Sequence, residues 1–267
     1  METDLFRDED TDDFLRLAAD EGWVSDQWEI EFLRRASPQG CLVKRILAFP
    51  MAFVTTVRYE RSGWLGNLLV HPALRRRGIG SKLLTEAITS LEQAEIETLW
   101  LTASPSGKPL YEQLGFRGID RIDRWLGEDF AITPPPKRHD PPEWLKELDA
   151  AGWGDRRDCL MTALAEEGDT LIGRDSFLMT RSLGGVRQIG PWGGTAAEAA
   201  ALFERSVALV TNGERICLDV PKGNELESFL ERRGLKKIGT TTLMYRGATP
   251  AYRPELIGAC AGMGSMG

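Results

Sequence analysis

Residues 75 to 80 combine positive charge with glycine in a pattern that suits phosphate binding. Three consecutive arginines stand directly before Gly78 and Gly80, in a chain whose net charge is −7. The apolar run "LLV" precedes this loop and a helical pattern follows it. A helix that begins after a strand and a glycine loop presents free backbone N–H groups, and the positive end of its dipole attracts anions. Glycine lets the backbone approach such a ligand closely, and arginine side chains bind further phosphate oxygens.

The spacing of the glycines excludes two common nucleotide-binding loops. A dinucleotide fingerprint GxGxxG needs a third glycine where Leu83 stands. A P-loop, GxxxxGK[ST], needs a glycine five positions before Gly80, where Arg75 stands, and Gly80 is followed by Ser-Lys rather than Lys-Ser. The pattern that fits is RxxGxG.

Periodic hydrophobic residues predict the elements that hold this loop. The apolar residues between Leu83 and Leu91 recur on one helical face, which predicts a helix that leaves the loop and packs on a sheet. Strands are predicted at 41–48, 50–60, 63–70, 97–103 and 116–122, and helices within 10–22, 25–37 and 108–115. The first half of the chain is therefore predicted to be an α/β domain.

A proline-rich segment, "TPPPKRHDPPE" at 133–143, marks the clearest boundary, because proline neither continues a helix nor pairs inside a sheet. We predict two domains in the 267 residues, at 1–133 and 143–267, with a linker at 134–142. The glycine-rich end, "GMGSMG", is interpreted as a flexible or docked tail.

The second half repeats the pattern of the first. "LWLTASPSGKPLYEQLGF" and "ICLDVPKGNELESFLERRGL" share a strand, a loop, a helix, a glycine and an apolar residue in that order, which favours a duplicated fold. Leu230 stands where Tyr111 stands when Gly115 and Gly234 are aligned, and the corresponding loop, "RQIGPWGGTA", lacks the arginine run. One cofactor site per chain is therefore expected.

Composition narrows the function classes. The acidic balance argues against a general nucleic-acid or acidic-membrane surface. The acidic N-terminus lacks a secretory signal and no apolar stretch is long enough to span a membrane, so a cytoplasmic location is expected. The four cysteines are scattered, which predicts unpaired thiols, and with only two histidines no His-rich metal site is expected. The sequence carries no signal for oligomeric state.

The loop and the helix after it resemble the GCN5-related N-acetyltransferase (GNAT) superfamily. That superfamily binds the pyrophosphate of acetyl coenzyme A with [RQ]xxGx[GA] between a strand and a helix, and "VHPALRRRGIGSKLL" is similar to it. "PLYEQLGF" is similar to the superfamily's later LYxxxGF element, and the two together cover roughly 64–118. The full chain resembles a bacterial subgroup with a second, diverged GNAT-like domain, a weaker likeness over 143–247. The resemblance implies tandem α/β (α+β) domains, each with a mixed, largely antiparallel sheet flanked by helices.

The resemblance also implies a cofactor, a reaction and a set of site residues. Acetyl coenzyme A is the expected cosubstrate, without a metal, and an amine is expected to attack its thioester directly. Tyr111 is implied as the general acid that protonates the leaving thiolate. A backbone N–H near Leu69 or Val70 is expected to polarise the thioester carbonyl. The residues expected to bind the cofactor are Leu69, Val70, Arg75, Arg76, Arg77, Gly78, Ile79, Gly80 and Ser81.

The sequence departs from the family at the general base. Some members carry a catalytic Glu on the strand before the loop, but "GWLGNLL" contains no carboxylate. Others carry Asn at the end of the next strand, where Ala103 and Ser104 stand here. A water chain, or a carboxylate from the N-terminal helices or the second domain, remains open as the base. Trp23, Trp28 and Trp192 are candidates for lining a substrate pocket, although core or interface packing is the commoner role of tryptophan.

The function predicted from these features is an N-acetyltransferase that acts on a small-molecule amine. Two alternatives stay open: a protein N-acetyltransferase, and a non-catalytic sensor of acyl coenzyme A or a metabolite.

Overall fold

The computed structural model describes residues 2–128, 141–194, 196–207, 214–224 and 226–267, and the chain folds into two compact units. The first unit contains Met1–Arg117, Met244–Thr249 and Gly264–Gly267, and the second contains Gly118–Leu243 and Pro250–Met263. Most of the linker predicted at 134–142 lies outside the described residues, and the predicted domain boundaries stay a prediction.

The first unit is built on a mixed sheet with the strand order β1-β2-β3-β4-β5-β11. Strands β1 to β4 pair antiparallel, whereas β5 pairs parallel with β4. Its elements are β1 (Thr3–Leu5), α1 (Thr11–Asp20), α2 (Gln27–Ala36), β2 (Leu42–Ile46), β3 (Phe49–Arg58), β4 (Ser62–Val70), α3 (Ile79–Gln93), β5 (Thr98–Ala103), α4 (Lys108–Gln113) and the end of β11 (Lys236–Gly247).

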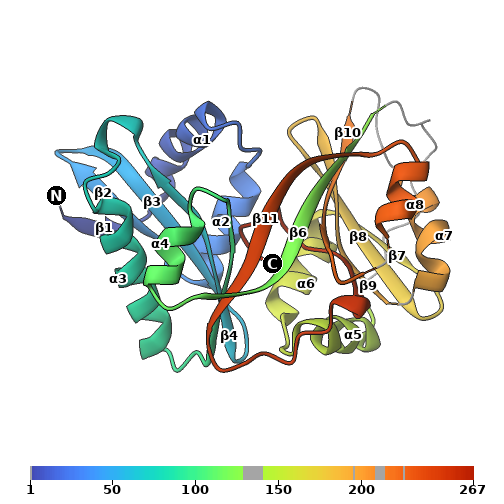
Figure 1. The fold of residues 1–267 in the computed structure, drawn as a ribbon. Coiled ribbons are helices and arrows are strands. Elements are labelled where there is room, and N and C mark those ends of the chain that lie inside the picture. Colours follow the sequence, from blue (N-terminus) through green and yellow to red (C-terminus); the bar gives the residue numbers. More distant parts are fainter. Residues whose placement is uncertain (1, 129–140, 195, 208–213, 225) are drawn as a thin grey trace. The chain divides into compact units, whose positions relative to one another are not determined.

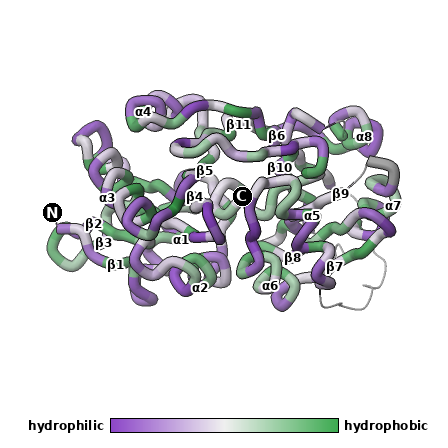
Figure 2. Tube along the Cα trace, turned by 90° about the horizontal axis from the view of Figure 1, so that it is seen from below, coloured by the Kyte–Doolittle hydropathy of each residue, from purple (hydrophilic) through white to green (hydrophobic). Residues whose placement is uncertain are grey.

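Helices cover both faces of this sheet (Figure 1). Ala52 and Val54 of β3 belong to a buried cluster with the apolar face of α3. Phe53, between them, points to the opposite face and packs edge-on against Phe14 of α1, with ring centroids 5.4 Å apart. Figure 2 shows hydrophilic and hydrophobic residues alternating along the helices, as expected for helices with one buried face.

The second unit has its own mixed, largely antiparallel sheet, in the order β11-β6-β10-β9-β8-β7, with β12 on β9. Strands β7, β8 and β9 pair antiparallel, and β10 pairs parallel with β9. Its elements are β6 (Arg117–Gly127), α5 (Glu143–Trp153), α6 (Asp158–Glu167), β7 (Asp169–Ile172), β8 (Ser176–Leu183), β9 (Val186–Gly194), α7 (Ala196–Val207), β10 (Arg215–Pro221), α8 (Glu227–Arg232) and β12 (Ile257–Ala259).

The two units repeat one arrangement, as the sequence predicts. In each, two helices precede three antiparallel strands, and a helix then leads to a strand that is parallel to the third. The next helix ends at Gly115 in one unit and at Gly234 in the other, and both glycines have φ of 84°. Because a side chain disfavours this left-handed conformation, glycine ends both helices. The predicted fold class is confirmed.

The N-terminal strand and the last four residues of the glycine-rich tail, Gly264–Gly267, belong to the first unit. The tail is docked: Trp64 Nε1 donates to the carbonyl oxygen of Gly264 at 3.1 Å, and the Tyr59 hydroxyl donates to that of Met266. All four cysteines are free thiols. Within the described ranges, none of the helices has the length and apolar character needed to cross a membrane.

Candidate cofactor site

The loop between β4 and α3 has a backbone that only glycine adopts readily. Gly78 caps α3 with φ 73° and ψ 5°, in the left-handed region, and Arg76 is also left-handed with φ 60°. This turn directs the chain into the 15 residues of α3. The N–H groups of the first turn, from Ile79 onward, have no carbonyl partner within the helix and carry its positive dipole end. The loop therefore presents an anion-binding surface.

Gly80 brings the start of α3 close to the end of β4. A Cβ atom at Gly80 would lie 3.4 Å from Val70 Cγ2 and 4.0 Å from Leu68 Cδ2. The helix terminus and the strand thus form one wall, with space only for a small residue at position 80.

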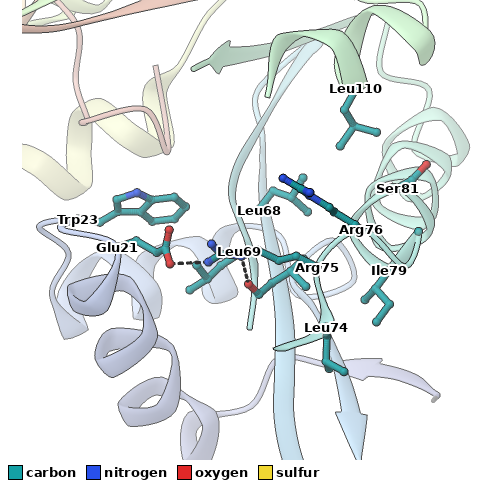
Figure 3. Close-up of a pocket in the computed structure, with 13 residues that line it drawn as sticks. Glu21, Trp23, Leu68, Leu69, Leu74, Arg75, Arg76, Ile79, Ser81 and Leu110 are labelled. Carbon is teal, nitrogen blue, oxygen red and sulfur yellow. Dashed lines mark hydrogen bonds and ion pairs between the residues drawn. The ribbon is translucent and has the colours of Figure 1, made fainter. Parts of the chain in front are cut away.

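A pocket of about 370 Å³ lies against this wall (Figure 3). Figure 3 shows Glu21 and Trp23 on one side, Ile79 and Ser81 on the other, and Arg75 and Arg76 between them. The residues that line it are Glu21, Trp23, Leu68, Leu69, Val70, Leu74, Arg75, Arg76, Gly78, Ile79, Gly80, Ser81 and Leu110. Most of the residues expected to bind the cofactor are therefore brought together here. Arg77 is exposed and is not part of the lining.

Arg75 is held by two partners. Its Nε donates to the carbonyl oxygen of Val70 at 2.9 Å, and its Nη2 pairs with the carboxylate of Glu21. The guanidinium therefore ties the loop to the end of β4 and to the end of α1. Arg76 also lines the pocket, and its backbone is left-handed; Figure 3 shows its side chain among the other lining residues.

Strand β4 is distorted where it meets the pocket. Phe53 of β3 pairs with Leu69, but Thr55 pairs with Gly66, so one residue of β3 faces two of β4 and a β-bulge results. Asn67 occupies the bulge with φ 53°. A bulge bends the strand locally, and here it does so next to the residues that line the pocket.

Strands β4 and β5 also separate. Among the described residues, their paired positions run from Ser62–Thr98 to Trp64–Trp100, although both strands continue. His71 N donates to the carbonyl oxygen of Met51 at 2.9 Å. Because successive N–H groups of a strand point to opposite sides, the N–H of Val70 points away from β3 and toward the gap beside β5.

Tyr111 lies on α4, one residue after Leu110 of the pocket lining. Its ring packs edge-on against Phe116, with centroids 6.1 Å apart, and covers Gly107 at the start of the helix. Burial raises the pKa of the Tyr111 phenol to about 12, so the hydroxyl keeps its proton at neutral pH. The residue itself is not among those that line the pocket.

One side of the pocket is formed by Trp23, one of the three candidate tryptophans, and by Glu21, which the sequence did not single out. Glu21 and Trp23 come from the segment between α1 and α2, and Trp23 is 39% exposed. Of the three candidate tryptophans, Trp28 stacks on Phe32 and Trp192 is 2% exposed in the core of the second unit. An exposed tryptophan beside a Gly22 turn carries no periodic signal, so its place in the pocket follows only from tertiary structure.

The corresponding helix of the second unit begins differently. Glu198, in the first turn of α7, accepts hydrogen bonds from the Ser176 hydroxyl at 2.9 Å and from the N–H of Arg174. A carboxylate thus stands near this helix start, where the first unit has its arginine run. Leu230, aligned with Tyr111, is fully buried. Within the part of the chain that the structure describes, no group of three or more His, Cys, Asp or Glu side chains is arranged to hold a metal ion.

Comparison with known proteins identifies one family in both halves of the chain. A family model described as "Acetyltransferase (GNAT) domain" matches residues 45–124, and a second with the same description matches 145–257. [Ribosomal protein bS18]-alanine N-acetyltransferase from Salmonella typhimurium is 40% identical over 68 residues, which are 24% of this chain and 46% of that protein. The chain thus spans less than half the length of this relative.

Solved structures share the fold over nearly the whole chain. One from Pyrococcus horikoshii has a TM-score of 0.82 at 20% identity, covering 98% of this chain and 94% of its own. The GCN5-related N-acetyltransferase from Sphaerobacter thermophilus has a TM-score of 0.62 at 15% identity, covering 94% and 98%. At these identities the likeness shows the fold. Together with the two family matches, it establishes that this chain belongs to the GCN5-related N-acetyltransferase superfamily and carries a second acetyltransferase-like domain.

Proposed function

We propose that the protein transfers the acetyl group of acetyl coenzyme A to a primary amine of a small molecule. The observation that carries the proposal is the pocket where the first turn of α3 meets the end of β4. Acetyltransferases of this superfamily act on amines, and the RxxGxG loop, which resembles the superfamily's, lies within the first family match. A cytoplasmic location and a bacterial source stay predictions.

The residues of the pocket fit this cofactor. A pyrophosphate needs N–H donors and positive charge, which Ile79, Gly80, Ser81 and the side chain of Arg76 supply. The close approach at Gly80 is consistent with a backbone that must reach a ligand. A narrow pantetheine arm suits the gap beside Leu69 and Val70. When bound, acetyl coenzyme A supplies an acetyl group activated as a thioester.

The chain's own groups then supply polarisation and a proton. We assign the N–H of Val70, which points toward the gap, to the thioester carbonyl oxygen, where it stabilises developing negative charge. We assign proton donation to the thiolate to Tyr111, whose phenol is protonated at neutral pH. Holding the two reactants in place contributes much of the rate, so a single acid and a fixed N–H form a workable site.

The experiment that tests this function measures thiol release from acetyl coenzyme A across a panel of small primary amines. We expect saturable release with at least one amine, and loss of release in Tyr111→Phe. Binding of the cofactor without turnover on any acceptor would contradict the enzyme and support a non-catalytic acyl coenzyme A sensor.

A second acceptor class is favoured by one comparison. The Salmonella relative acetylates the alanine of a ribosomal protein, according to its name, and is 40% identical over the matched segment. The panel therefore includes short peptides with a free N-terminal alanine and the same peptides with a blocked N-terminus. Transfer to the free peptides but to no small amine would place this chain among protein N-acetyltransferases.

A further inference from the structure

Glu29 is a buried carboxylate that the steps proposed above do not use. It lies in the first turn of α2 and is 4% exposed. The side chain of Asp26, which caps the helix, accepts a hydrogen bond from Glu29 N at 2.9 Å and fixes this turn. Asn67 Nδ2 donates to Glu29 Oε1 at 3.2 Å. A carboxylate on a helix is thus tied to the bulge of β4.

The bulge is the place where β4 becomes accessible. The strand is buried from Ser62 to Leu65, whereas Gly66, Asn67 and Leu68 are partly exposed. Leu68, next to Asn67, lines the pocket. Asn67, the partner of Glu29, therefore lies beside the wall of the pocket. It is on β4, the strand that ends at Val70.

Two buried hydroxyls near the bulge have hydrogen-bonding capacity to spare. Thr55 is fully buried and Ser265 is 4% exposed, and neither Oγ atom has a hydrogen-bond partner among the described residues. Thr55 pairs with Gly66 in the β3–β4 ladder. A Cβ atom at Gly66 would lie 2.7 Å from the Cα atom of Ser265. Thr55 and Ser265 thus both lie next to Gly66, the residue before Asn67.

These groups share one face of the sheet. Thr55 stands two residues from Phe53, which packs on α1, so its side chain points to the same face. Glu29 approaches from α2, which packs on β3. Buried polar atoms normally have partners, and an unsatisfied one costs about 1–3 kcal/mol. A polar ligand at the bulge would satisfy the hydroxyls and face a carboxylate.

We propose that this cluster receives the acceptor and that Glu29 is the general base, positioned by Asn67. This inference rests on the proposed acetyl transfer and identifies its general base, which the steps above do not include. The acceptor binds as an ammonium and first loses one proton through the Glu29 carboxylate to solvent, which frees the nitrogen lone pair. A second proton of the nitrogen passes to the Glu29 carboxylate as the N–C bond to the acetyl carbonyl forms. The C–S bond breaks, and the thiolate takes its proton from Tyr111. The proton on Glu29 then returns to Tyr111 through solvent, which restores both groups.

The ligand class follows from the chemistry of the cluster. A carboxylate beside hydroxyl oxygens and the Asn67 amide oxygen favours a primary alkylamine, because an ammonium group donates up to three hydrogen bonds to such acceptors. In some superfamily members, the strand before the loop carries a catalytic glutamate. In this chain the corresponding strand has Asn67 and apolar residues and no carboxylate. Glu29 reaches the same strand from a helix, so the base and its support come from two elements.

The test compares Glu29→Gln with Glu31→Gln in the full chain. Glu31 is exposed on the same helix, bonded to Gln27 Nε2, and is the matched control. Calorimetry measures acetyl coenzyme A affinity and the binding of alkylamines to the protein loaded with coenzyme A, and thiol release gives kcat/KM. We expect Glu29→Gln to keep cofactor affinity, weaken alkylamine binding and lower kcat/KM about a hundredfold or more. The loss should be smaller for hydroxylamine, which is neutral at the assay pH and needs no base to release its lone pair.

Asn67→Gly tests the positioning role. Glycine keeps the positive φ of the bulge and deletes only the amide. We expect kcat to fall while KM for acetyl coenzyme A stays unchanged; an unchanged kcat would overturn this role.

The remaining outcomes separate the inference from the proposed function. Glu29→Gln with wild-type kcat/KM, or with equal losses for alkylamine and hydroxylamine, overturns Glu29 as the base while acetyl transfer stands. If alkylamine binding depends on Glu29 but the protein transfers no acetyl group, the amine site is supported and the proposed acetyltransferase activity is refuted. Failure of every alkylamine to bind the loaded wild-type protein overturns the amine site.

Discussion

Arg75 Nε donates to the carbonyl oxygen of Val70 at 2.9 Å, so the first residue of the RxxGxG loop is fastened to the last residue of β4. The same guanidinium pairs with Glu21. The sequence alone suggests that all three arginines meet phosphate, whereas the contacts give Arg75 a role in holding the loop. Arg75 therefore fixes the geometry of the loop, whereas the neighbouring Arg76 is the residue proposed to bring positive charge to the cofactor.

If Arg75 mainly holds the loop, replacing Arg75 and replacing its partner Glu21 should affect cofactor binding differently. Arg75→Gln removes a charge-assisted hydrogen bond at a partly exposed site and should weaken coenzyme A binding about tenfold. Glu21→Gln removes only an exposed ion pair and a negative charge from the pocket, so affinity should stay the same or rise slightly. Calorimetric titration with coenzyme A checks both. Equal weakening by the two variants would contradict the role of the Val70 contact.

Position 80 should discriminate between a methyl group and a carboxylate. Gly80→Ala places its Cβ in ordinary contact with Val70 Cγ2 at 3.4 Å and should keep cofactor binding. Gly80→Glu adds bulk and negative charge where the pyrophosphate is proposed to lie, and should abolish binding while the fold stays intact. Calorimetry measures the affinity, and circular dichroism checks the fold. Wild-type affinity in Gly80→Glu would refute the assignment of the loop.

Tyr111→Phe should lower kcat about a hundredfold or more and leave cofactor affinity unchanged. The matched control is Tyr245→Phe, because Tyr245 packs on Trp100 away from the pocket lining and should keep wild-type kcat. Steady-state kinetics with the amine found in the panel measure both variants. A silent Tyr111→Phe would rule out the proton-donor role.

The raised pKa of Tyr111 also has a consequence for stability. Burial raises the pKa to about 12 in the folded protein, above its unfolded value of about 10. The neutral phenol therefore favours the folded state below pH 10, and this preference is lost as pH rises through about 12. Absorbance of the phenolate, compared between wild type and Tyr111→Phe, reports where the group titrates.

In the second unit, one ion pair should dominate local stability. Asp149 and Arg157 form a bidentate pair of 2.6 and 2.9 Å, and both side chains are 3% exposed or less. Asp149→Ala removes the bidentate partner of a buried guanidinium and should cost about 3–5 kcal/mol of unfolding free energy. Arg156→Ala breaks partly exposed pairs with Asp158 and Glu143 and should lower the unfolding free energy far less. Urea unfolding measures both, and similar costs would contradict the prediction.

The sequence was sufficient for features with a local cause. The α3 helix, its glycine cap and the repeated pattern that ends at Gly115 and Gly234 all follow from periodicity and from backbone conformations that need glycine. The general base was not predictable in this way. Glu29 looks like any acidic residue in the first turn of a helix, and its contact with Asn67 depends on how α2 packs on the sheet.

The same reason explains why Glu21 was not predicted and why Trp23 was only one of three candidate tryptophans. Both residues enter the pocket because of the path that the chain takes between α1 and α2, which the periodicity of the sequence does not encode. The β-bulge at Asn67 also has no mark in the sequence, because asparagine is common in many turns that are not bulges.

The first unit takes its final pieces from late in the chain, at Met244–Thr249 and Gly264–Gly267. During synthesis, most of the second domain is therefore made before β11 can pair with the sheet of the first unit. The Gly264 carbonyl, which accepts a hydrogen bond from Trp64, is made later still. Expression of residues 1–128 alone would remove Met244 from the core cluster around α3. The first unit thus matches a family domain over residues 45–124, yet part of its sheet and core comes from residues that follow most of the second unit.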